Sequence, residues 1–243
     1  NGTVLLWPEQ GLGDIVLFSS LIPELVEKAD QLIVKTDKRL IPLFKRSFAN
    51  KITYFGKNDF LPEEAYDYQI PMGSLPKIFR PSNESFKEGP QKLLKADEAK
   101  TQIYRKKLIA NNHKKVIGIS WKTTNIQSLK AAINLEELIS VIYSSNIRFV
   151  NLQYGDVQEE IYNVKLKYGF EIFEIEELDN FYDIDGLAAL VKACDEVITI
   201  DNITAYLAGA LGVSTKVILN TSSYWPHGID DKRSCWFPSI KFF

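Results

Sequence analysis

Residues 7–14, Trp-Pro-Glu-Gln-Gly-Leu-Gly-Asp, directly follow the apolar run Thr3-Val4-Leu5-Leu6. The apolar run predicts a buried strand, and helical spacing of apolar residues predicts a helix that begins near Asp14 (Ile15, Leu17, Phe18, Leu21 and Leu25). Gly11 and Gly13 let the backbone turn tightly and approach a ligand, because they carry no Cβ. Open α/β folds bind ligands at such strand-to-helix turns, so Asp14 is the first candidate for chemistry.

This turn departs from the two common phosphate-binding motifs. In the G-x-G-x-x-G spacing of dinucleotide-binding proteins the third glycine would fall on Val16. A P-loop is excluded because no Gly-Lys-Ser/Thr follows. An acid in the first turn of the helix would also repel a pyrophosphate. Two interpretations of Asp14 stay open, a functional carboxylate and a helix N-cap.

Composition limits the function class. The chain has 243 residues, is 45% hydrophobic and carries a net charge of -2, which argues against a general nucleic-acid or membrane-surface binder. The only cysteines, Cys194 in an expected buried helix and Cys235, indicate a reducing compartment without a disulfide framework. We see no signal peptide and no apolar run of roughly 18 residues. We expect a domain excised from a longer chain and a cytoplasmic location, with the inner face of the cytoplasmic membrane as an alternative.

Strands and helices alternate along the chain. We expect strands at residues 3–6, 31–35, 52–55, 67–70, 115–121, 148–152, 171–173, 197–200 and 216–219. Helices are expected near residues 40–48, 90–112, 135–143, 157–167, 186–193 and 203–211. This alternation is typical of α/β proteins with parallel sheets covered on both faces. Because the pattern restarts after a strandless polar interval, we expect two domains, residues 1–112 and 113–243.

The second domain has a ligand-binding motif of its own. Glu196-Val197-Ile198-Thr199-Ile200 predicts a buried strand, and Asp201-Asn202-Ile203-Thr204 opens the next helix. The N-terminus of a helix presents amide groups and the positive end of a dipole, which suits a phosphate. Asn202 and Thr204 would add side-chain hydrogen bonds. Plain helix capping is the alternative interpretation.

Two further strand ends carry polar residues. Ser120, Lys122 and, a few residues on, Lys130 follow one strand, and lysine and hydroxyl groups suit diphosphate oxygens. The next strand ends at Gln153, and Glu159 on the following helix is positioned to accept from ribose hydroxyls. An ordinary solvated loop is the alternative for Lys122.

These segments carry a resemblance to a known family. The runs EQGLGD, YDYQIPMGSLP (residues 66–76), GISW, FVNLQYGD and VITIDNITAYLAGALG occur in the order found in glycosyltransferase family 9, which includes the bacterial heptosyltransferases. The chain most resembles the branch fused behind tetratricopeptide repeats, and SCWFPS (residues 234–239) is similar to that branch as well. The resemblance spans nearly the whole chain.

The resemblance implies a GT-B fold, in which two Rossmann-like domains face each other across a cleft. It also implies an inverting, metal-independent transfer of a sugar from a nucleoside-diphosphate sugar to a hydroxyl of a glycan or other acceptor, with no cofactor. Asp14 matches the general base on the acceptor side, with Gln10, Gly11 and Gly13 beside it. The donor side is implied to contain Ser120, Lys122, Lys130, Gln153, Glu159, Asp201, Asn202, Thr204 and Tyr206. Tetratricopeptide repeats are implied as fused or working partners.

Some residues depart from the family pattern or imitate another one. Relatives commonly have histidine in place of Tyr206 and threonine in place of Asn202, which allows a different donor sugar or a weakened enzyme. Asp183-Ile184-Asp185 has the D-x-D spelling of metal-dependent transferases, but we interpret it as turn or cap residues. Of the two histidines, we expect His113 in a linker and His227 at the cleft.

Three rivals to the transferase hypothesis remain open. The first is a nucleotide- or sugar-binding module that kept the fold and lost turnover, which Tyr206 favours and Asp14 disfavours. The second is a nucleotide-sugar epimerase, which would form product from the donor alone. The third is an interaction domain that docks a partner through the basic helix between Lys92 and Lys107, although such a charge run is usually a solvated face.

Overall fold

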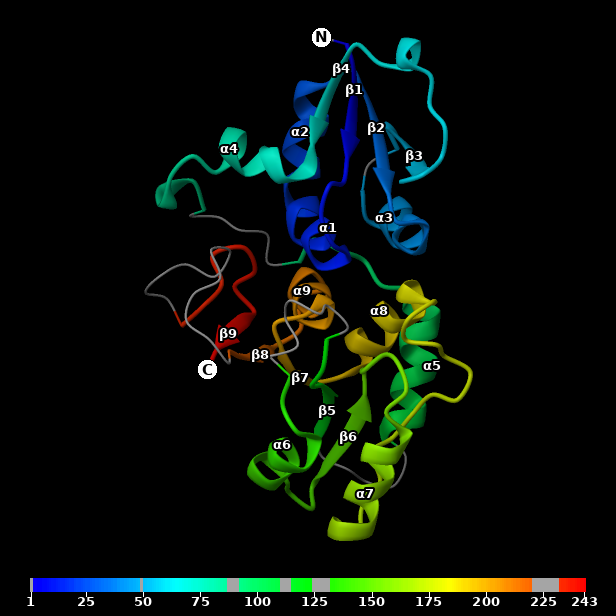
Figure 1. Ribbon diagram of the computed structural model, residues 1–243, viewed down its shortest axis with the longest axis vertical. Coiled ribbons are helices and arrows are strands. Elements are labelled where there is room, and N and C mark those ends of the chain that lie inside the picture. The colour runs from blue at the N-terminus through cyan, green and yellow to red at the C-terminus, as the bar shows by residue number, and fades with distance from the viewer. Residues whose placement is uncertain (1, 49, 87–91, 110–114, 124–131, 220–231) are drawn as a thin grey trace.

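The chain folds around two separate parallel β-sheets, one in each half (Figure 1). The computed structural model describes residues 2–48, 50–86, 92–109, 115–123, 132–219 and 232–243. Strand β1 (Thr3–Trp7) runs toward the second half, so the turn that follows it faces that half (Figure 1).

The first sheet has the strand order β3-β2-β1-β4, and all of its pairs are parallel. In register, Leu5 at the centre lies opposite Ile33 on one side and Gln69 on the other. Short 3₁₀ turns and four helices connect the strands. The elements are β1, β2 (Gln31–Thr36), β3 (Ile52–Gly56), β4 (Tyr68–Pro71), α1 (Leu12–Phe18), α2 (Ile22–Lys28), α3 (Ile41–Ser47) and α4 (Leu75–Phe79).

The second sheet has the order β6-β5-β7-β8-β9 and is also parallel throughout. Its central strand β7 is buried at every residue, as expected for a strand covered on both faces. The elements are β5 (Lys115–Ser120), β6 (Ile147–Asn151), β7 (Glu196–Ile200), β8 (Thr215–Ile218), β9 (Ile240–Phe242), α5 (Glu98–Ile109), α6 (Leu135–Ile142), α7 (Gln158–Tyr168), α8 (Ile184–Ala193) and α9 (Ile203–Ala210).

One hydrophobic cluster joins the two halves. It includes Leu6 and Phe18 from the first half and Leu207 and Trp236 from the second. Trp236 packs edge-on against Phe18, with ring centroids 5.9 Å apart, and against Phe86 at 4.9 Å. The apolar contact between the halves therefore continues the core of each, which stabilises their relative placement.

Most of the expected elements are confirmed, with several differences. Residues 171–173 form no strand, because Phe173 makes only a single bridge to Val150. The charged helix begins at Glu98, because the N–H groups of Leu93 and Leu94 donate to the carbonyl of Ala210. Strand β9, three residues long, was not expected.

The helix expected to follow the glycine turn is divided into α1 and α2. A 3₁₀ turn, Ser19–Leu21, lies between them. The Ser19 hydroxyl donates to the carbonyl of Val16 at 2.7 Å, and Pro23 has no N–H to continue the hydrogen-bond ladder. The expected division between residues 112 and 113 lies outside the described residues. Helix α5, just before it, packs along α8.

Candidate functional site

The glycine turn between β1 and α1 holds Asp14 near the start of the helix. Gly11 is the N-cap, so the cap interpretation of Asp14 is wrong in its literal form. Asp14 lies three positions later, and its Oδ2 accepts from the backbone N–H of Gly11 at 3.2 Å. This is the carboxylate half of a capping box, and it fixes the orientation of the half-buried acid.

A neighbouring turn supports the glycine turn. Oε1 of Glu9 accepts from the N–H of Gly73 at 2.8 Å, which joins the β1–α1 turn to the 3₁₀ turn after β4. A Cβ at Gly73 would collide with the Glu9 carboxylate and lie 3.1 Å from Nε2 of Gln10. Glu9 was not singled out from the sequence, because its partner is 64 positions away.

Asn202, at the end of β7, is the N-cap of α9 and is buried. Its Oδ1 accepts from the N–H of Thr204 at 2.9 Å and from the Thr199 hydroxyl at 3.2 Å. Its Nδ2 donates to Ser120 Oγ at 2.8 Å and to the carbonyl of Lys122 at 3.1 Å. Asn202 therefore both caps α9 and ties it to the end of β5.

Gln153, at the end of β6, completes the connection of three strand ends. Its Oε1 accepts from Ser120 Oγ at 3.0 Å and from the N–H groups of Trp121 and Lys122, both at 2.9 Å. The predicted donor-side residues Ser120, Gln153 and Asn202 thus lie together at the carboxyl edge of the sheet. Ser120 hydrogen-bonds to both of the others, so the three side chains form one buried network.

Lys122 lies beside this network and forms an ion pair with Glu160. The same carboxylate accepts from the indole N–H of Trp121 at 2.8 Å. Glu159, the residue chosen from the sequence, is exposed on α7. The sequence offered two acids in the first turn of α7, and only the register of that helix decides which one reaches the strand ends.

The start of α9 contains a buried hydroxyl and a half-buried acid. Thr204 is fully buried, and its Oγ1 has no hydrogen-bond partner within the described part of the chain. Asp201 precedes the cap, and its Oδ1 accepts from the hydroxyl of Tyr206 at 2.8 Å. The positive end of the helix dipole lies at the same place.

The two turns meet across the halves of the molecule. Helix α1 packs against α9 (Figure 1). A Cβ on Gly13 would lie 3.2 Å from the ring of Tyr206. The structure therefore brings the Asp14 turn next to the start of α9. Lys130, His113 and His227 lie outside the described residues.

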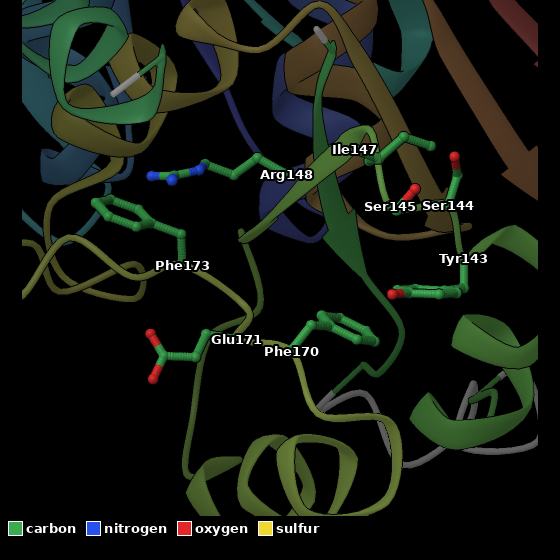
Figure 2. A pocket seen from close by; sticks show the side chains of 8 residues that line it. All are labelled: Tyr143, Ser144, Ser145, Ile147, Arg148, Phe170, Glu171 and Phe173. Atoms are coloured by element: carbon green, nitrogen blue, oxygen red, sulfur yellow. The ribbon is translucent and has the colours of Figure 1, made fainter. Parts of the chain in front are cut away.

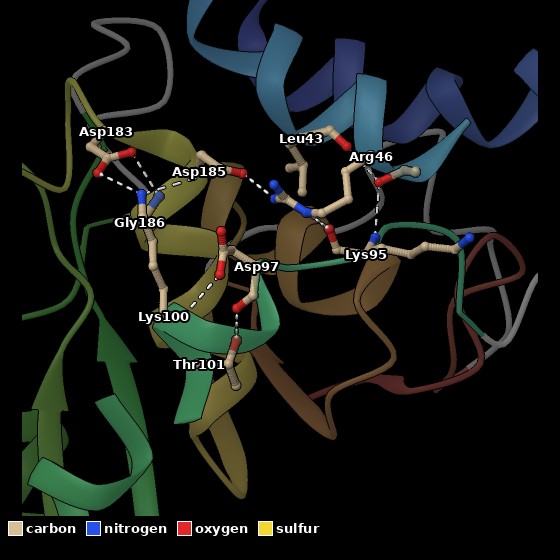
Figure 3. A network of polar contacts seen from close by, with 10 residues as sticks. Leu43, Arg46, Lys95, Asp97, Lys100, Thr101, Asp183, Asp185 and Gly186 are labelled. Atoms are coloured by element: carbon tan, nitrogen blue, oxygen red, sulfur yellow. Dashed lines mark hydrogen bonds and ion pairs between the residues drawn. The ribbon is translucent and has the colours of Figure 1, made fainter. Parts of the chain in front are cut away.

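The D-x-D acids have different roles, and one of them contacts the first half (Figure 3). Asp183 is the N-cap of α8 and accepts from the N–H of Gly186 at 2.7 Å, so its interpretation as a cap is confirmed. Asp185 forms an ion pair with Arg46 of α3. Nε of Arg46 also donates to the carbonyl of Lys95 at 2.7 Å. Through these two contacts Arg46 joins α3 to α8 and to the segment before α5.

A pocket of ≈ 280 Å³ lies elsewhere, at the amino end of β6 (Figure 2). The ring of Tyr143 stacks on Phe170 with centroids 4.8 Å apart, and the Arg148 guanidinium lies over Phe173. Ile147 and Arg148 begin β6, whereas Gln153 follows its end. This pocket is therefore at the opposite edge of the sheet from the joined strand ends.

Two properties of the described ranges concern membranes and metals. No helix there combines the length and the apolar character needed to cross a membrane. Nor do three or more His, Cys, Asp or Glu side chains gather there as a set able to hold a metal ion.

Comparisons with known sequences relate the whole chain to part of a longer protein. The chain matches no protein-family model. It is 31% identical over 259 residues to protein FlbA of Caulobacter vibrioides, a match that covers 99% of this chain and 43% of FlbA. The chain thus spans less than half the length of this curated relative.

Several solved glycosyltransferase structures have the same architecture. The family 9 glycosyltransferase of Veillonella parvula superposes with a TM-score of 0.65 at 12% identity, covering 100% of this chain and 85% of that one. The E. coli ADP-heptose lps heptosyltransferase II gives 0.56 at 13% identity, covering 99% and 90%. E. coli heptosyltransferase WaaC with ADP-2-deoxy-2-fluoro heptose gives 0.54 at 15% identity, covering 99% and 92%. At these identities the likeness shows the fold, and the chain has the two-domain GT-B architecture of these proteins.

Proposed function

We propose that this chain is a glycosyltransferase that moves a sugar from a nucleoside-diphosphate sugar to an acceptor hydroxyl. The observation that carries the proposal is the contact between the Asp14 turn and the start of α9, made through Gly13 and Tyr206. A carboxylate in the first half lies opposite a helix N-terminus in the second half. The GT-B fold and the nucleotide-sugar enzymes that share it support the same function.

Asp14 acts as the general base. A sugar hydroxyl is a poor nucleophile, and a positioned carboxylate assists by taking its proton as the hydroxyl attacks the anomeric carbon. The bond from the Gly11 N–H orients the carboxylate for this task. Attack from the side opposite the departing diphosphate inverts the anomeric centre.

The start of α9 receives the donor diphosphate. The helix dipole and the buried hydroxyl of Thr204 favour the negative charge that develops on the leaving group. Because Asn202 is held by Ser120 and Lys122, the helix start is fixed before the donor binds. Lys122 adds a positive charge near the helix start. We assign the ribose contact to Glu160, the ion-pair partner of Lys122, in place of Glu159. No metal ion takes part in this scheme.

Nucleotide binding tests the donor site first. ADP, GDP and UDP are titrated into the protein by calorimetry and thermal denaturation, since a ligand at 100 times its dissociation constant stabilises by about 2.7 kcal/mol. We expect at least one diphosphate to bind and the corresponding monophosphate to bind more weakly. If none of the three diphosphates binds, the donor site is wrong.

Turnover tests the base. Release of ADP from ADP-heptose and of GDP from GDP-fucose is measured with water and with methyl glycosides as acceptors. Asp14→Asn keeps an oxygen that accepts from the Gly11 N–H, so it is expected to fold, to bind the diphosphate and to lose turnover. Binding without turnover in the wild type would favour a binding module, and conversion of the donor sugar alone would favour an epimerase. Tetratricopeptide repeats as partners stay a prediction from the sequence.

A further inference from the structure

Tyr206 is a side chain at the contact between the two halves of the proposed active site. It lies one turn into α9 and is 6% exposed. A Cβ built on Gly13 would lie 3.2 Å from its Cδ2 and 3.5 Å from its Cε2. The ring therefore packs against the backbone of the turn, at the residue directly before Asp14.

The same ring is anchored at its other end. The Tyr206 hydroxyl donates to Oδ1 of Asp201 at 2.8 Å, and Asp201 directly precedes the N-cap of α9. The backbone of α9 fixes the base of the side chain and Asp201 fixes its tip. An aromatic ring held at both ends is a rigid spacer, because it has few rotamers left to lose.

We propose that Tyr206 is a positioning residue, whose ring sets the distance between Asp14 and the donor end of α9. The inference rests on the proposed function and adds a role for a residue that need not touch either substrate. Gly13 lies on the other side of the contact, where an added Cβ would require the ring to shift by a few tenths of an ångström. Catalysis by a base depends steeply on placement, since a misplacement on the order of 1 Å can cost about 100-fold in rate.

Four variants test the contact: Tyr206→Phe, Tyr206→Leu, Gly13→Ala and the double variant Gly13→Ala/Tyr206→Leu. Phenylalanine keeps the ring against Gly13 and loses only the bond to Asp201. Leucine keeps apolar burial and loses the ring. The methyl group of Gly13→Ala meets the tyrosine ring, whereas leucine gives it room, so the two single effects must not add in the double variant.

The first readout is the split between kcat and KM for ADP-heptose or GDP-fucose, whichever the wild type turns over. Tyr206→Leu is expected to lower kcat by about 10- to 100-fold with little change in donor KM. Tyr206→Phe is expected to recover most of that loss. Tyr54→Leu and Tyr54→Phe are matched controls, because Tyr54 is a partly buried core tyrosine on β3, and they should lower stability without this split.

The second readout needs no turnover. In protein labelled with ¹⁵N-glycine, the Tyr206 ring current should shift the Gly13 resonance, Tyr206→Phe should keep that shift and Tyr206→Leu should lose it. Adding ADP or GDP should move the Gly13 resonance in the wild type and not in Tyr206→Leu. Any of three results would overturn the inference. The Gly13 resonance does not change in Tyr206→Leu, the effects of Gly13→Ala and Tyr206→Leu add in the double variant, or kcat is unchanged in Tyr206→Leu. Absence of any nucleotide binding by the wild type would instead overturn the proposed function on which it rests.

Discussion

The side-chain amide of Asn202 donates to Ser120 Oγ at 2.8 Å, across 82 positions of sequence. The bond joins the cap of α9 to the end of β5, and Ser120 passes the connection on to Gln153 at the end of β6. One buried network therefore holds three strand ends. Because its members satisfy one another, it needs no ligand to be formed.

Asn202→Ala is expected to destabilise the protein by about 2 kcal/mol, because it removes a helix cap and leaves buried partners unsatisfied. Urea unfolding measures this loss. Affinity for ADP or GDP should fall as well, since α9 loses the bond that fixes its start.

Asn134→Ala is the matched control. Asn134 is also an N-cap, for α6, and its Oδ1 accepts from the N–H of Glu136 at 2.8 Å, but it is exposed. It should cost about 1 kcal/mol and leave nucleotide affinity unchanged. Equal effects of the two substitutions on affinity would contradict a special role for Asn202.

Arg46→Met is expected to lower the free energy of unfolding by about 1–2 kcal/mol. The substitution removes the ion pair with Asp185 and the hydrogen bond to the carbonyl of Lys95 (Figure 3). Methionine keeps the apolar packing of the arginine stem. Limited proteolysis of the connection between α4 and α5, which links the two halves, should become faster. In a double-mutant cycle with Asp185→Asn, the two losses should be less than additive.

Lys165→Met is the matched control, which tests whether loss of an ion pair elsewhere has the same effect as Arg46→Met. Lys165 pairs with Glu171 at 2.5 Å, but both side chains are largely exposed and lie within the second half. Such a pair contributes little. Faster proteolysis in Lys165→Met would argue that Arg46 has no particular role between the halves.

The elements were predictable because their signals are local. Residues 115–121 are mostly apolar, and the strand expected there spans Lys115–Ser120. Asn202 and Asp183 precede apolar helical runs and do cap them. The isolated bridge at Phe173 failed as a strand prediction because three residues carry too little periodicity to tell a strand from a passing contact.

The contacts between distant residues were not predictable from one sequence. Nothing local pairs Arg46 with Asp185 or Gly13 with Tyr206, since each pair depends on how the two halves dock. The choice of Glu160 over Glu159 depends on the rotation of α7 about its axis. Burial of Gly118 against Leu152 and Cys194 likewise follows only from the packing of β5 on its neighbours.

Asp37 gives a testable acid dependence. The Arg39 side chain, which hydrogen-bonds to it, holds the pKa of the Asp37 carboxyl below its usual value, although partial burial opposes this. The folded state then binds the proton less readily than the unfolded state, whose pKa is about 3.9. The stabilisation is therefore complete above about pH 5 and is lost as the pH falls through the lower folded pKa.

Asp37→Asn should remove this dependence. The difference in unfolding free energy between wild type and Asp37→Asn is expected to be constant at neutral pH and to shrink below about pH 4. Arg39→Met should flatten the acid limb in the same way. It should also cost stability at neutral pH, because Arg39 donates to the carbonyl of Phe181 in the other half at 2.8 Å. A difference that grows as the pH falls would contradict the assignment.

The two cysteines should differ sharply in reactivity toward a thiol reagent such as 5,5′-dithiobis(2-nitrobenzoate). Burial raises the pKa of the Cys194 thiol to about 12, and its Sγ donates to the carbonyl of Leu190. Because the thiolate is the reactive form, Cys194 is expected to react only after unfolding, whereas the partly exposed Cys235 reacts in the folded protein. In Cys235→Ser the remaining reaction should be slow and accelerate with urea along the unfolding transition. Fast reaction of Cys235→Ser without urea would show that the end of α8 at Cys194 opens locally in the folded protein.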